Sequence, residues 1–219
     1  MKTINKPEPG PPDAADDPPI TLRPAAPGDA AVAAALIHAA GPALYSWLFG
    51  PTRADAEALF GALFVLGGSV FSHENGVVAV QDGRVVGLAL AVSATAYHRG
   101  WALPRMLLRR GPRFLLRLVP AAFALNGSTL PPPPGAFYLG ILAVAPDARS
   151  RGVGGRLLGE VERLARGAGC DSVCLHAEIG NAGARRFYAR HGYVVTHERP
   201  TPRAARRGVA GFVGMRKAL

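Results

Sequence analysis

The sequence predicts a mixed α/β (α+β) fold. Three observations lead to this prediction: a hairpin pattern in the first half, a strand followed by a glycine-rich loop and a helix in the second half, and a further strand and helix after that. The chain has 219 residues, which suits one large domain with a well-filled core or at most two small ones.

The first half is predicted to begin with a strand and two helices. A short strand is expected at Ile20–Arg23, and Asp29 can cap a helix that runs to about Ala40. Thr52 can cap a second helix with one apolar face. That face consists of Leu59, Phe60, Leu63 and Phe64.

A hairpin is predicted from two apolar runs, Val77–Val80 and Arg84–Val92. They flank Asp82 and Gly83, and the dipeptide Asp-Gly favours the two-residue turn that joins antiparallel strands. Two neighbouring strands of the sheet are therefore expected to be antiparallel.

The second half is organised around a strand, a loop and a helix. Apolar and β-branched residues at Phe137–Val144 indicate a strand, Pro146 and Asp147 break it, and helical spacing starts at Val153. Backbone N–H groups at such a helix N-terminus carry about half a positive charge, to which arginines add. The loop is predicted to hold an anion, with phosphate as the favoured ligand. It contains Arg149, Ser150, Arg151, Gly152, Val153, Gly154 and Gly155.

Residue spacing separates three kinds of phosphate loop. A nucleotide-hydrolase loop requires a lysine after its glycines, and a dinucleotide loop requires G-x-G-x-x-G with an acidic residue about 20 positions on. Neither pattern fits. The pattern present is R-x-x-G-x-G at Arg149, Gly152 and Gly154. A glycine-rich turn with solvated arginines is the structural alternative.

Another strand and helix follow. Ser172–Glu178 is predicted to be a strand, and Asn181 can begin a helix that carries Phe187 and Tyr188. The helix is expected to stop near His191.

Two motifs in this half resemble the GCN5-related N-acetyltransferase (GNAT) family. One is R-x-x-G-x-G after the strand, and the other is N-x-x-A-x-x-x-Y-x-x-x-G-F/Y. The second consists of Asn181, Ala184, Tyr188, Gly192 and Tyr193. The resemblance is close over residues 137–195 and looser over residues 20–92. It implies a mostly antiparallel central sheet with splayed strands 4 and 5 and helices on both faces.

The resemblance also implies an activity. A GNAT enzyme moves an acetyl group from acetyl-coenzyme A to a primary amine, here of a small molecule or a peptide N-terminus, by direct attack. Main-chain groups of Leu142, Ala143 and Val144 would pair with the pantetheine arm. The amides from Arg151 to Gly155 would hold the pyrophosphate, with Arg149 and Ser150 in the same loop. Asn181 would cap its helix, contact the coenzyme, or do both.

Tyr188 is the predicted general acid, because the matching tyrosine of the family protonates the departing thiolate. The alternative is an aromatic side chain packed in the core beside Phe187. For the general base, the sequence leaves several candidates. One family position for a glutamate is Tyr138 here, and another is His176, whose imidazole is suited to accept a proton. Glu178 follows on the same strand face, and a water chain to solvent is a third possibility.

The acceptor pocket is expected to be shaped by four aromatic residues and by the unusual segment before the fourth strand. The aromatic residues are Tyr45, Trp47, Phe49 and Tyr97. A different class of function is a non-catalytic acyl-coenzyme A sensor or docking module on the same scaffold. The intact loop and Tyr188 favour an enzyme.

The net charge of +10 is concentrated locally. Residues 95–136 contain six arginines interleaved with apolar residues and no acidic residue, and they end in four consecutive prolines. This basic amphipathic insertion is expected to form one or two helices and a stiff linker. It suits a peripheral membrane surface, an acidic partner or polyphosphate; alternatively it packs on the core with its arginines solvated. No nucleic-acid-binding motif accompanies it.

The remaining features set the context. Residues 1–19 are rich in proline and poor in apolar residues, so a disordered tail is expected before a domain at 20–219. Apolar residues make up 49% of the chain and mean hydropathy is +0.15, with no apolar run near the ~20 residues of a membrane span. Cys170 and Cys174 are expected to be buried thiols in a reducing cytoplasm, with no metal site. A homodimer is possible.

Overall fold

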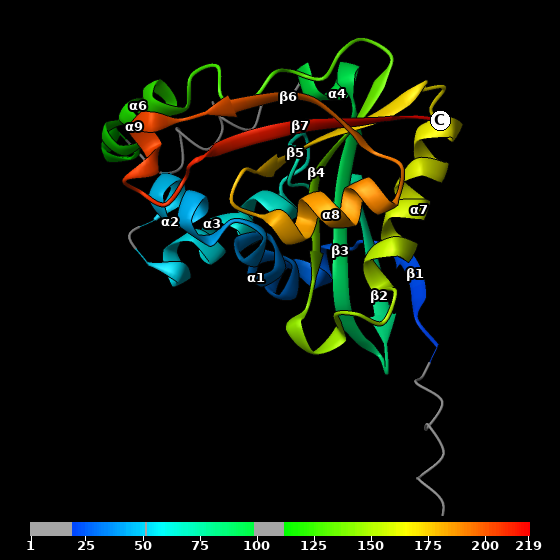
Figure 1. Cartoon of the computed structure of the whole chain (residues 1–219). Helices are drawn as coiled ribbons and strands as arrows, with labels where there is room; N and C mark the ends of the chain where they lie inside the picture. Colours follow the sequence, from blue (N-terminus) through cyan, green and yellow to red (C-terminus); the bar gives the residue numbers. More distant parts are fainter. Residues whose placement is uncertain (1–18, 51, 99–111) are drawn as a thin grey trace, which may run out of the picture.

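The computed structural model describes residues 19–50, 52–98 and 112–219 (Figure 1). The predicted tail, except for residue 19, and the middle of the basic insertion lie outside these residues. The strands form one sheet in the order β1-β2-β3-β4-β5-β7-β6, in which only β4 and β5 are parallel. The predicted mixed, mostly antiparallel sheet is confirmed.

The strands are β1 (Thr21–Pro24), β2 (Gly76–Gln81), β3 (Arg84–Ser93), β4 (Ala136–Val144), β5 (Ser172–Glu178), β6 (Val194–Pro200) and β7 (Gly211–Ala218). The α-helices are α1 (Ala30–Ala40), α2 (Pro42–Phe49), α3 (Arg53–Val65), α4 (Ala94–His98), α6 (Pro112–Leu125), α7 (Val153–Gly167), α8 (Ala182–Arg190) and α9 (Pro202–Ala205). Short 3-10 turns are η1 (Pro27–Asp29), η2 (His73–Asn75) and η3 (Pro146–Ala148).

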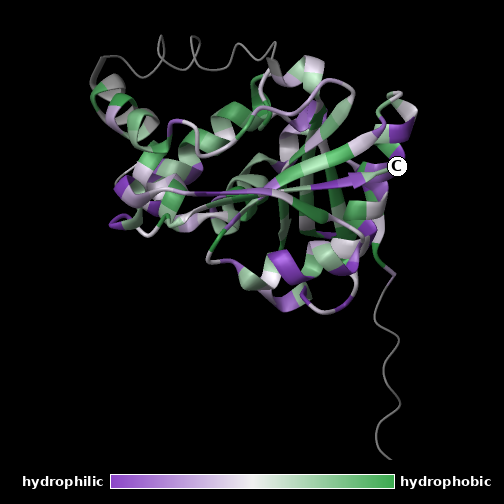
Figure 2. Ribbon diagram, turned by 45° about the horizontal axis from the view of Figure 1, so that its top comes forward, coloured by the Kyte–Doolittle hydropathy of each residue, from purple (hydrophilic) through white to green (hydrophobic). Residues whose placement is uncertain are grey.

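Helices cover both faces of the sheet, as predicted. On one face, α7 and α8 pack on the strands around the fully buried Leu157 and Leu175. On the other, α1 and α3 enclose a core around Ile37, Phe60 and Leu88. Hydrophobic residues fill the central strands, and hydrophilic residues lie mainly on the outer helices and loops (Figure 2).

A partly buried ion pair joins α7 to the last strand. Glu162, only 8% exposed, accepts hydrogen bonds from Lys217 Nζ at 2.8 and 2.7 Å. It also accepts one from the hydroxyl of Tyr193 at 3.3 Å. This network connects the α7 face of the sheet to β7.

The hairpin and the cap of α3 agree with the predictions. Asp82 and Gly83 have φ angles of 51° and 70°, so both adopt the left-handed conformation that a type I′ turn needs. The hydroxyl of Thr52 accepts a hydrogen bond from the amide of Asp55, and the four predicted apolar residues of α3 are buried.

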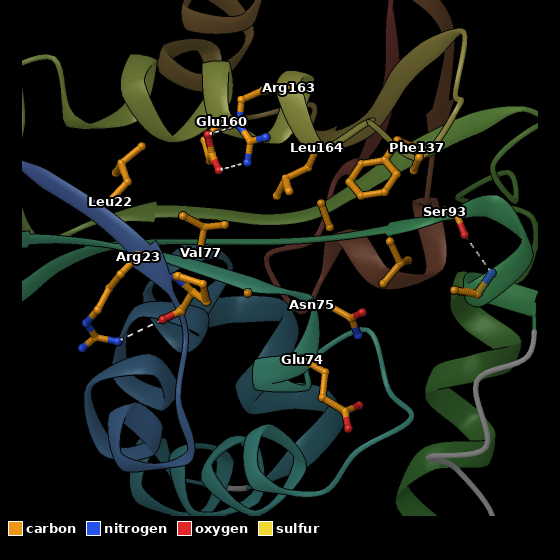
Figure 3. Close-up of a pocket in the computed structure, with 16 residues that line it drawn as sticks. Leu22, Arg23, Glu74, Asn75, Val77, Ser93, Phe137, Glu160, Arg163 and Leu164 are labelled. Carbon is orange, nitrogen blue, oxygen red and sulfur yellow. Dashed lines mark hydrogen bonds and ion pairs between the residues drawn. The ribbon is translucent and has the colours of Figure 1, made fainter. Parts of the chain in front are cut away.

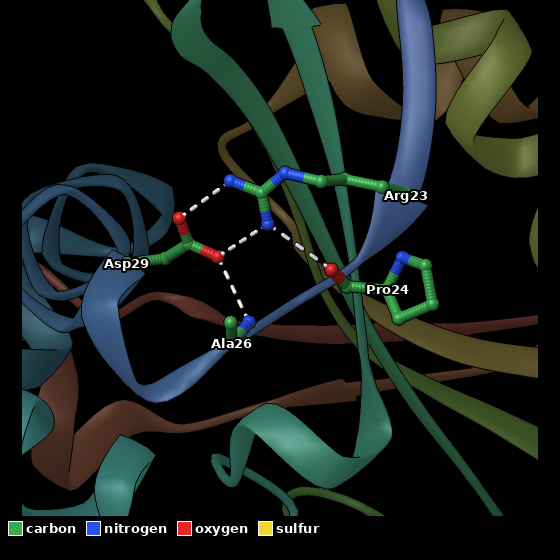
Figure 4. Close-up of polar contacts among 4 residues, drawn as sticks. All are labelled: Arg23, Pro24, Ala26 and Asp29. Atoms are coloured by element: carbon green, nitrogen blue, oxygen red, sulfur yellow. Dashed lines mark hydrogen bonds and ion pairs between the residues drawn. The ribbon is translucent and has the colours of Figure 1, made fainter.

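Asp29 occupies the N-cap position of α1, but its side chain does not cap the helix. The Asp29 carboxylate instead accepts two hydrogen bonds from the Arg23 guanidinium, at 2.8 and 2.7 Å, and one from the amide of Ala26 at 2.8 Å (Figure 4). The hydrogen bond from Arg23 lowers the pKa of Asp29. The predicted cap is wrong because the carboxylate ties β1 to the turn before α1.

The prediction of two helices between β1 and β2 is also wrong, since α2 is a third. Gly41 ends α1, and Pro42 occupies the first turn of α2, where its missing N–H has no cost. Among the described residues, no single helix is both long and apolar enough to cross a membrane. The segments Pro27–Ala40 and Pro42–Phe49 meet that test only as a pair, and they are bent by 111°.

The described ends of the insertion contain two helices, α4 and α6, before an irregular segment at the prolines. The number of helices expected in the insertion stays a prediction, because residues 99–111 lie outside the described residues.

The central pair of parallel strands separates along its length. Residues 136–139 of β4 pair with residues 172–175 of β5. Beyond them, β4 continues its pairing with β3, and β5 continues its pairing with β7. A gap therefore opens in the sheet after Leu139 and Leu175, at the end of β4 that leads to the glycine-rich loop.

Candidate active site

The glycine-rich loop leads from β4 through η3 to α7. Ser150 and Gly152 both have positive φ angles, 64° and 79°, and Gly152 is the N-cap of α7. The N–H of Arg156 makes the first intrahelical bond, to the carbonyl oxygen of Gly152 at 3.1 Å. As at any helix N-terminus, the N–H groups before it have no intrahelical acceptor and carry the positive end of the helix dipole. The loop can therefore bind an anion.

Only one of the three loop glycines borders open space. A Cβ added to Gly152 would have no atom within 4 Å. A Cβ on Gly154 would meet the ring of Phe187 at 3.3 Å, and one on Gly155 would meet His191 Nε2 at 3.2 Å. Gly154 and Gly155 therefore allow α8 to pack closely on α7, a role the sequence analysis did not assign to them.

A cavity of about 100 Å³ lies where β4 and β5 separate. It brings together five predicted site residues from three elements. They are Leu142 of β4, His176 and Glu178 of β5, and Asn181 and Tyr188 at α8. Gly41, Tyr45 and Phe212 also line it. The loop residues 149–155 are not among its lining residues. Ala143 faces the core between the sheet and α1, and Val144 packs at the edge of the α7 core.

Tyr188 is 8% exposed, and its ring lies 5.3 Å from that of Phe187 and 5.7 Å from that of Tyr193. Burial raises the pKa of Tyr188, so the phenol is protonated at neutral pH. Its side chain both packs in the core and lines the cavity, so a packing role and a role as general acid are compatible for Tyr188. A protonated phenol at this position can donate a proton to a group in the cavity.

Glu178 has a buried oxygen, Oε1, without a hydrogen-bond partner among the described residues. This oxygen lies near Gly41, since a Cβ added there would be 3.3 Å from it. Burial raises the pKa of Glu178. A carboxylate in this position favours a cationic ligand, because a buried charge is costly unless it is paired.

His176 lies two residues before Glu178 and lines the same cavity. Its Nδ1 is 3.4 Å from the hydroxyl of Tyr138, and its buried Nε2 has no partner among the described residues. Burial, together with the nearby His197, lowers the pKa of His176 to about 4. His176 is therefore neutral at pH 7 and is a weaker proton acceptor than the sequence analysis assumed.

Asn181 is the N-cap of α8, where its Oδ1 accepts a hydrogen bond from the amide of Ala184 at 2.9 Å. It also lines the cavity, so its position is compatible with both predicted roles.

Of the four aromatic residues expected to shape the acceptor pocket, Tyr45 alone lines this cavity. Phe49 packs against Phe60 with ring centroids 5.3 Å apart, and Trp47 packs with the cluster around Phe212. Tyr97 contacts Tyr138 at 5.1 Å, edge to face. The sequence analysis missed His197, which lies 5.4 Å from His176, because no motif surrounds it.

The two cysteines are free thiols. Cys174 is buried, which raises its pKa to about 11, and Cys170 is partly buried. Within the described ranges, no group of three or more His, Cys, Asp or Glu side chains is placed to hold a metal ion.

A larger cavity, of about 530 Å³, lies between β1, α4 and the C-terminal half of α7 (Figure 3). It contains none of the predicted site residues. Its arginines are paired: Arg163 with Glu160 at 2.6 Å, and Arg23 with Asp29 at 2.7 Å. This second cavity is therefore separate from the gap between β4 and β5.

A model of the acetyltransferase (GNAT) family matches residues 42–193, more than half of the chain. The chain belongs to the GNAT family of acetyltransferases. It is 34% identical over 59 residues to GCN5-related N-acetyltransferase 4, chloroplastic, of Arabidopsis thaliana. That match covers 27% of this chain and only 20% of the relative.

Solved structures share the fold. One described as an acetyltransferase has a TM-score of 0.68 at 20% identity, covering 90% of this chain and 98% of its own. The PaiA N-acetyltransferase of Thermoplasma acidophilum, solved in complex with coenzyme A, has a TM-score of 0.53 at 12% identity, covering 92% and 99%. At these identities the similarity is one of fold.

Proposed function

We propose that this protein is an acetyl-coenzyme A-dependent N-acetyltransferase that acts by direct attack on a primary amine of a small molecule or a peptide N-terminus. One observation carries the proposal: a protonated Tyr188 and a Glu178 carboxylate, whose Oε1 has no hydrogen-bond partner among the described residues, line one cavity in the gap of the sheet. Acetyl transfer needs a proton donor and a proton acceptor that lie close enough together to contact the same substrate.

The coenzyme would lie along the gap, with its pyrophosphate and its pantetheine arm held by different elements. The N–H groups at the start of α7 would bind the pyrophosphate, for which Gly152 leaves open space. The edge of β4 that faces the gap, Leu142–Val144, has no strand partner on that side and would pair with the pantetheine arm. A main-chain N–H there would polarise the thioester oxygen.

The acceptor would arrive as an ammonium ion. Glu178 is suited to bind it and to take its proton, since an unpaired, partly buried carboxylate with a raised pKa is both a cation ligand and a proton acceptor. The neutral amine then attacks the thioester carbon, a C–N bond forms, and the C–S bond breaks. The departing thiolate takes its proton from Tyr188. Of the two predicted bases, we therefore assign the first proton transfer to Glu178.

The test is thiol release from acetyl-coenzyme A over a panel of amines and peptides. Tyr188→Phe should lower kcat by about 100-fold or more, while coenzyme affinity measured by calorimetry stays unchanged. Tyr193→Phe is the matched control, because it removes a neighbouring phenol that bonds to Glu162 outside the cavity. Coenzyme binding without turnover of any acceptor would instead support an acyl-coenzyme A sensor.

A second proposal concerns the basic insertion, for which we infer contact with an anionic membrane surface. Leu116, Val119 and Phe123 project from α6 at 78%, 61% and 65% exposure. The guanidinium of Arg203 in α9 lies 5.1 Å from the ring centre of Phe123. The sequence has no acidic residue in 83–146 or in 199–219. Exposed apolar side chains beside arginines suit an anionic lipid surface.

Flotation with vesicles tests this contact. The protein should bind vesicles that contain phosphatidylglycerol and not those of phosphatidylcholine alone, and a Leu116→Glu, Phe123→Glu double variant should lose binding. If the double variant binds these vesicles as well as the wild type does, the membrane assignment is overturned. It is also overturned if the wild type is a dimer and the double variant is a monomer.

A further inference from the structure

Two histidines from different strands meet across a glycine beside the candidate active site. In the register of the sheet, His176 of β5 and His197 of β6 are both opposite Gly214 of β7. Their ring centroids are 5.4 Å apart, with the rings at 62° to each other. The two imidazoles are therefore neighbours although a whole strand separates their backbones.

Gly214 makes this contact possible. A Cβ built on Gly214 would overlap the imidazole of His197, approaching its Nδ1 and Nε2 to 2.5 Å. The His197 ring thus occupies the space that a side chain on β7 would fill. Any residue other than glycine would move this ring away from its place.

Both rings keep one nitrogen without a hydrogen bond. Nε2 of His176 and Nε2 of His197 are buried and have no partner among the described residues. The other nitrogen of each ring is near a hydroxyl: Tyr138 at 3.4 Å for His176, and Thr196 at 3.0 Å for His197. Buried polar nitrogens are rarely left unbonded, so each Nε2 is available to accept a proton or to bind a ligand.

The proton balance of acetylation gives this pair a role, which rests on the function proposed above. An ammonium acceptor loses two protons in becoming an amide. Glu178 takes the first, before attack. The second leaves the nitrogen of the tetrahedral intermediate, which is far more acidic than the free ammonium, so a weaker base suffices. Tyr188 gives one proton to the sulfur and regains it from the Glu178 carboxyl across the cavity that both line, and the second amine proton is released to water.

We propose that His176 takes the second proton of the amine, and that His197, whose ring packs against it across Gly214, is a positioning residue that opposes a positive charge on His176. The N–H bond of the intermediate breaks as an imidazole N–H bond forms. The imidazole then releases the proton to water.

Other groups surround the pair. Burial, and then the neighbouring His197, lowers the pKa of His176, while burial and the nearby Arg199 lower the pKa of His197. The titratable and charged groups on the strands and helix around the pair are Tyr97 of α4, Tyr138 of β4, Cys174 and Glu178 of β5, Arg199 of β6 and Arg216 of β7. Protonation of both imidazoles at once is therefore disfavoured, so the titrations of His176 and His197 are coupled.

The test is an NMR titration of the histidine ring signals in the free full-length protein, with a pH profile of kcat on the best acceptor. In His197→Gln, the apparent pKa of His176 should rise by about half a unit or more, because a neighbouring positive charge no longer competes. The acidic limb of the kcat profile should move upward with it. Gly214→Ala should give the same shift while His197 is still present.

Gly159→Ala on α7 is the matched control, since its added Cβ meets no atom within 4 Å, and it should leave both titration and profile unchanged. An unaltered titration of His176 in His197→Gln would overturn the pairing, whatever the fate of the Gly214 variant. If the wild-type protein acetylates no amine, the proposed function fails, but the NMR titration still decides whether His197 opposes protonation of His176.

Discussion

The guanidinium of Arg149 donates a hydrogen bond from Nε to the carbonyl oxygen of Val144, at 3.2 Å. The two residues lie on either side of η3, so the bond closes the turn between β4 and the glycine-rich loop. The position of the loop is therefore tied to the end of the strand that borders the gap.

Replacing Arg149 should weaken coenzyme binding more than catalysis. Arg149→Ala removes both a positive charge beside the loop and the bond to Val144. Hydrogen bonds that involve a charged group contribute about 1.5–3 kcal/mol, so the KM for acetyl-coenzyme A should rise by roughly tenfold or more. Arg166→Ala, at the opposite end of α7, is the control. A KM equal to that of the control would show that Arg149 is a solvated residue of a simple turn.

Substitutions of Gly152 separate backbone strain from charge. The φ of 79° costs a residue with a Cβ about 1–2 kcal/mol, although the Cβ itself has room. Gly152→Ala should thus lower stability slightly and keep measurable coenzyme affinity. Gly152→Glu should abolish affinity, since it adds a negative charge next to the pyrophosphate. Calorimetric binding of both variants checks this, and equal affinities would remove the loop assignment.

Glu178→Gln should stabilise the protein at neutral pH and inactivate it. The folded pKa of Glu178 is raised, so the folded state holds more protons than the unfolded state between pH 4.5 and the folded value. Its stabilising effect is present below pH 4.5 and is lost as pH rises. The Glu178→Gln variant does not lose this stability as pH rises. Its kcat should be lower by about 100-fold or more, because the proton acceptor is absent.

Melting temperatures of wild type and variant from pH 4 to 8 provide the measurement, with Glu57→Gln in an exposed ion pair as control. A lower melting temperature for Glu178→Gln at pH 7 would mean that the carboxylate has an internal partner.

Glu162 should be far more important for stability than Glu160 on the same helix. Glu162→Gln breaks a partly buried pair with Lys217 and leaves that ammonium without its counter-charge, which should cost about 2 kcal/mol. Glu160 pairs with the exposed Arg163, where water screens the charges, so Glu160→Gln should cost much less. Urea unfolding of both variants tests this, and equal losses would contradict it.

The local features of the fold were predictable where a single residue type fixes the backbone. Asp82 and Gly83 determine the hairpin, and Asn181 determines the start of α8. By contrast, α2 was missed because Gly41 and Pro42 look like a loop, although they end one helix and begin the next. The final strand β7 was missed because its glycines and basic residues lack strand periodicity; its place between β5 and β6 comes from tertiary pairing.

The candidate site was predictable only as far as motifs extend. The two motifs predicted Tyr188 and the glycine-rich loop as site residues. The alternation of side chains along a strand predicted that His176 and Glu178 share one face. Which of the two accepts a proton depends on burial and on neighbours from other strands. His197 reaches His176 only through the register of three strands and the missing side chain of Gly214, which no local pattern encodes.

The separation of β4 from β5 has a consequence for the motions of the molecule. In the part of the chain that the structure describes, four residue pairs, from Ala136↔Ser172 to Leu139↔Leu175, join β4 to β5 and so hold the two halves of the sheet together. In the free protein, amides of the diverging segments should exchange with deuterium faster than those of β3. A bound pantetheine would bridge the seam like a strand, so exchange should slow and the halves should unfold as one cooperative unit.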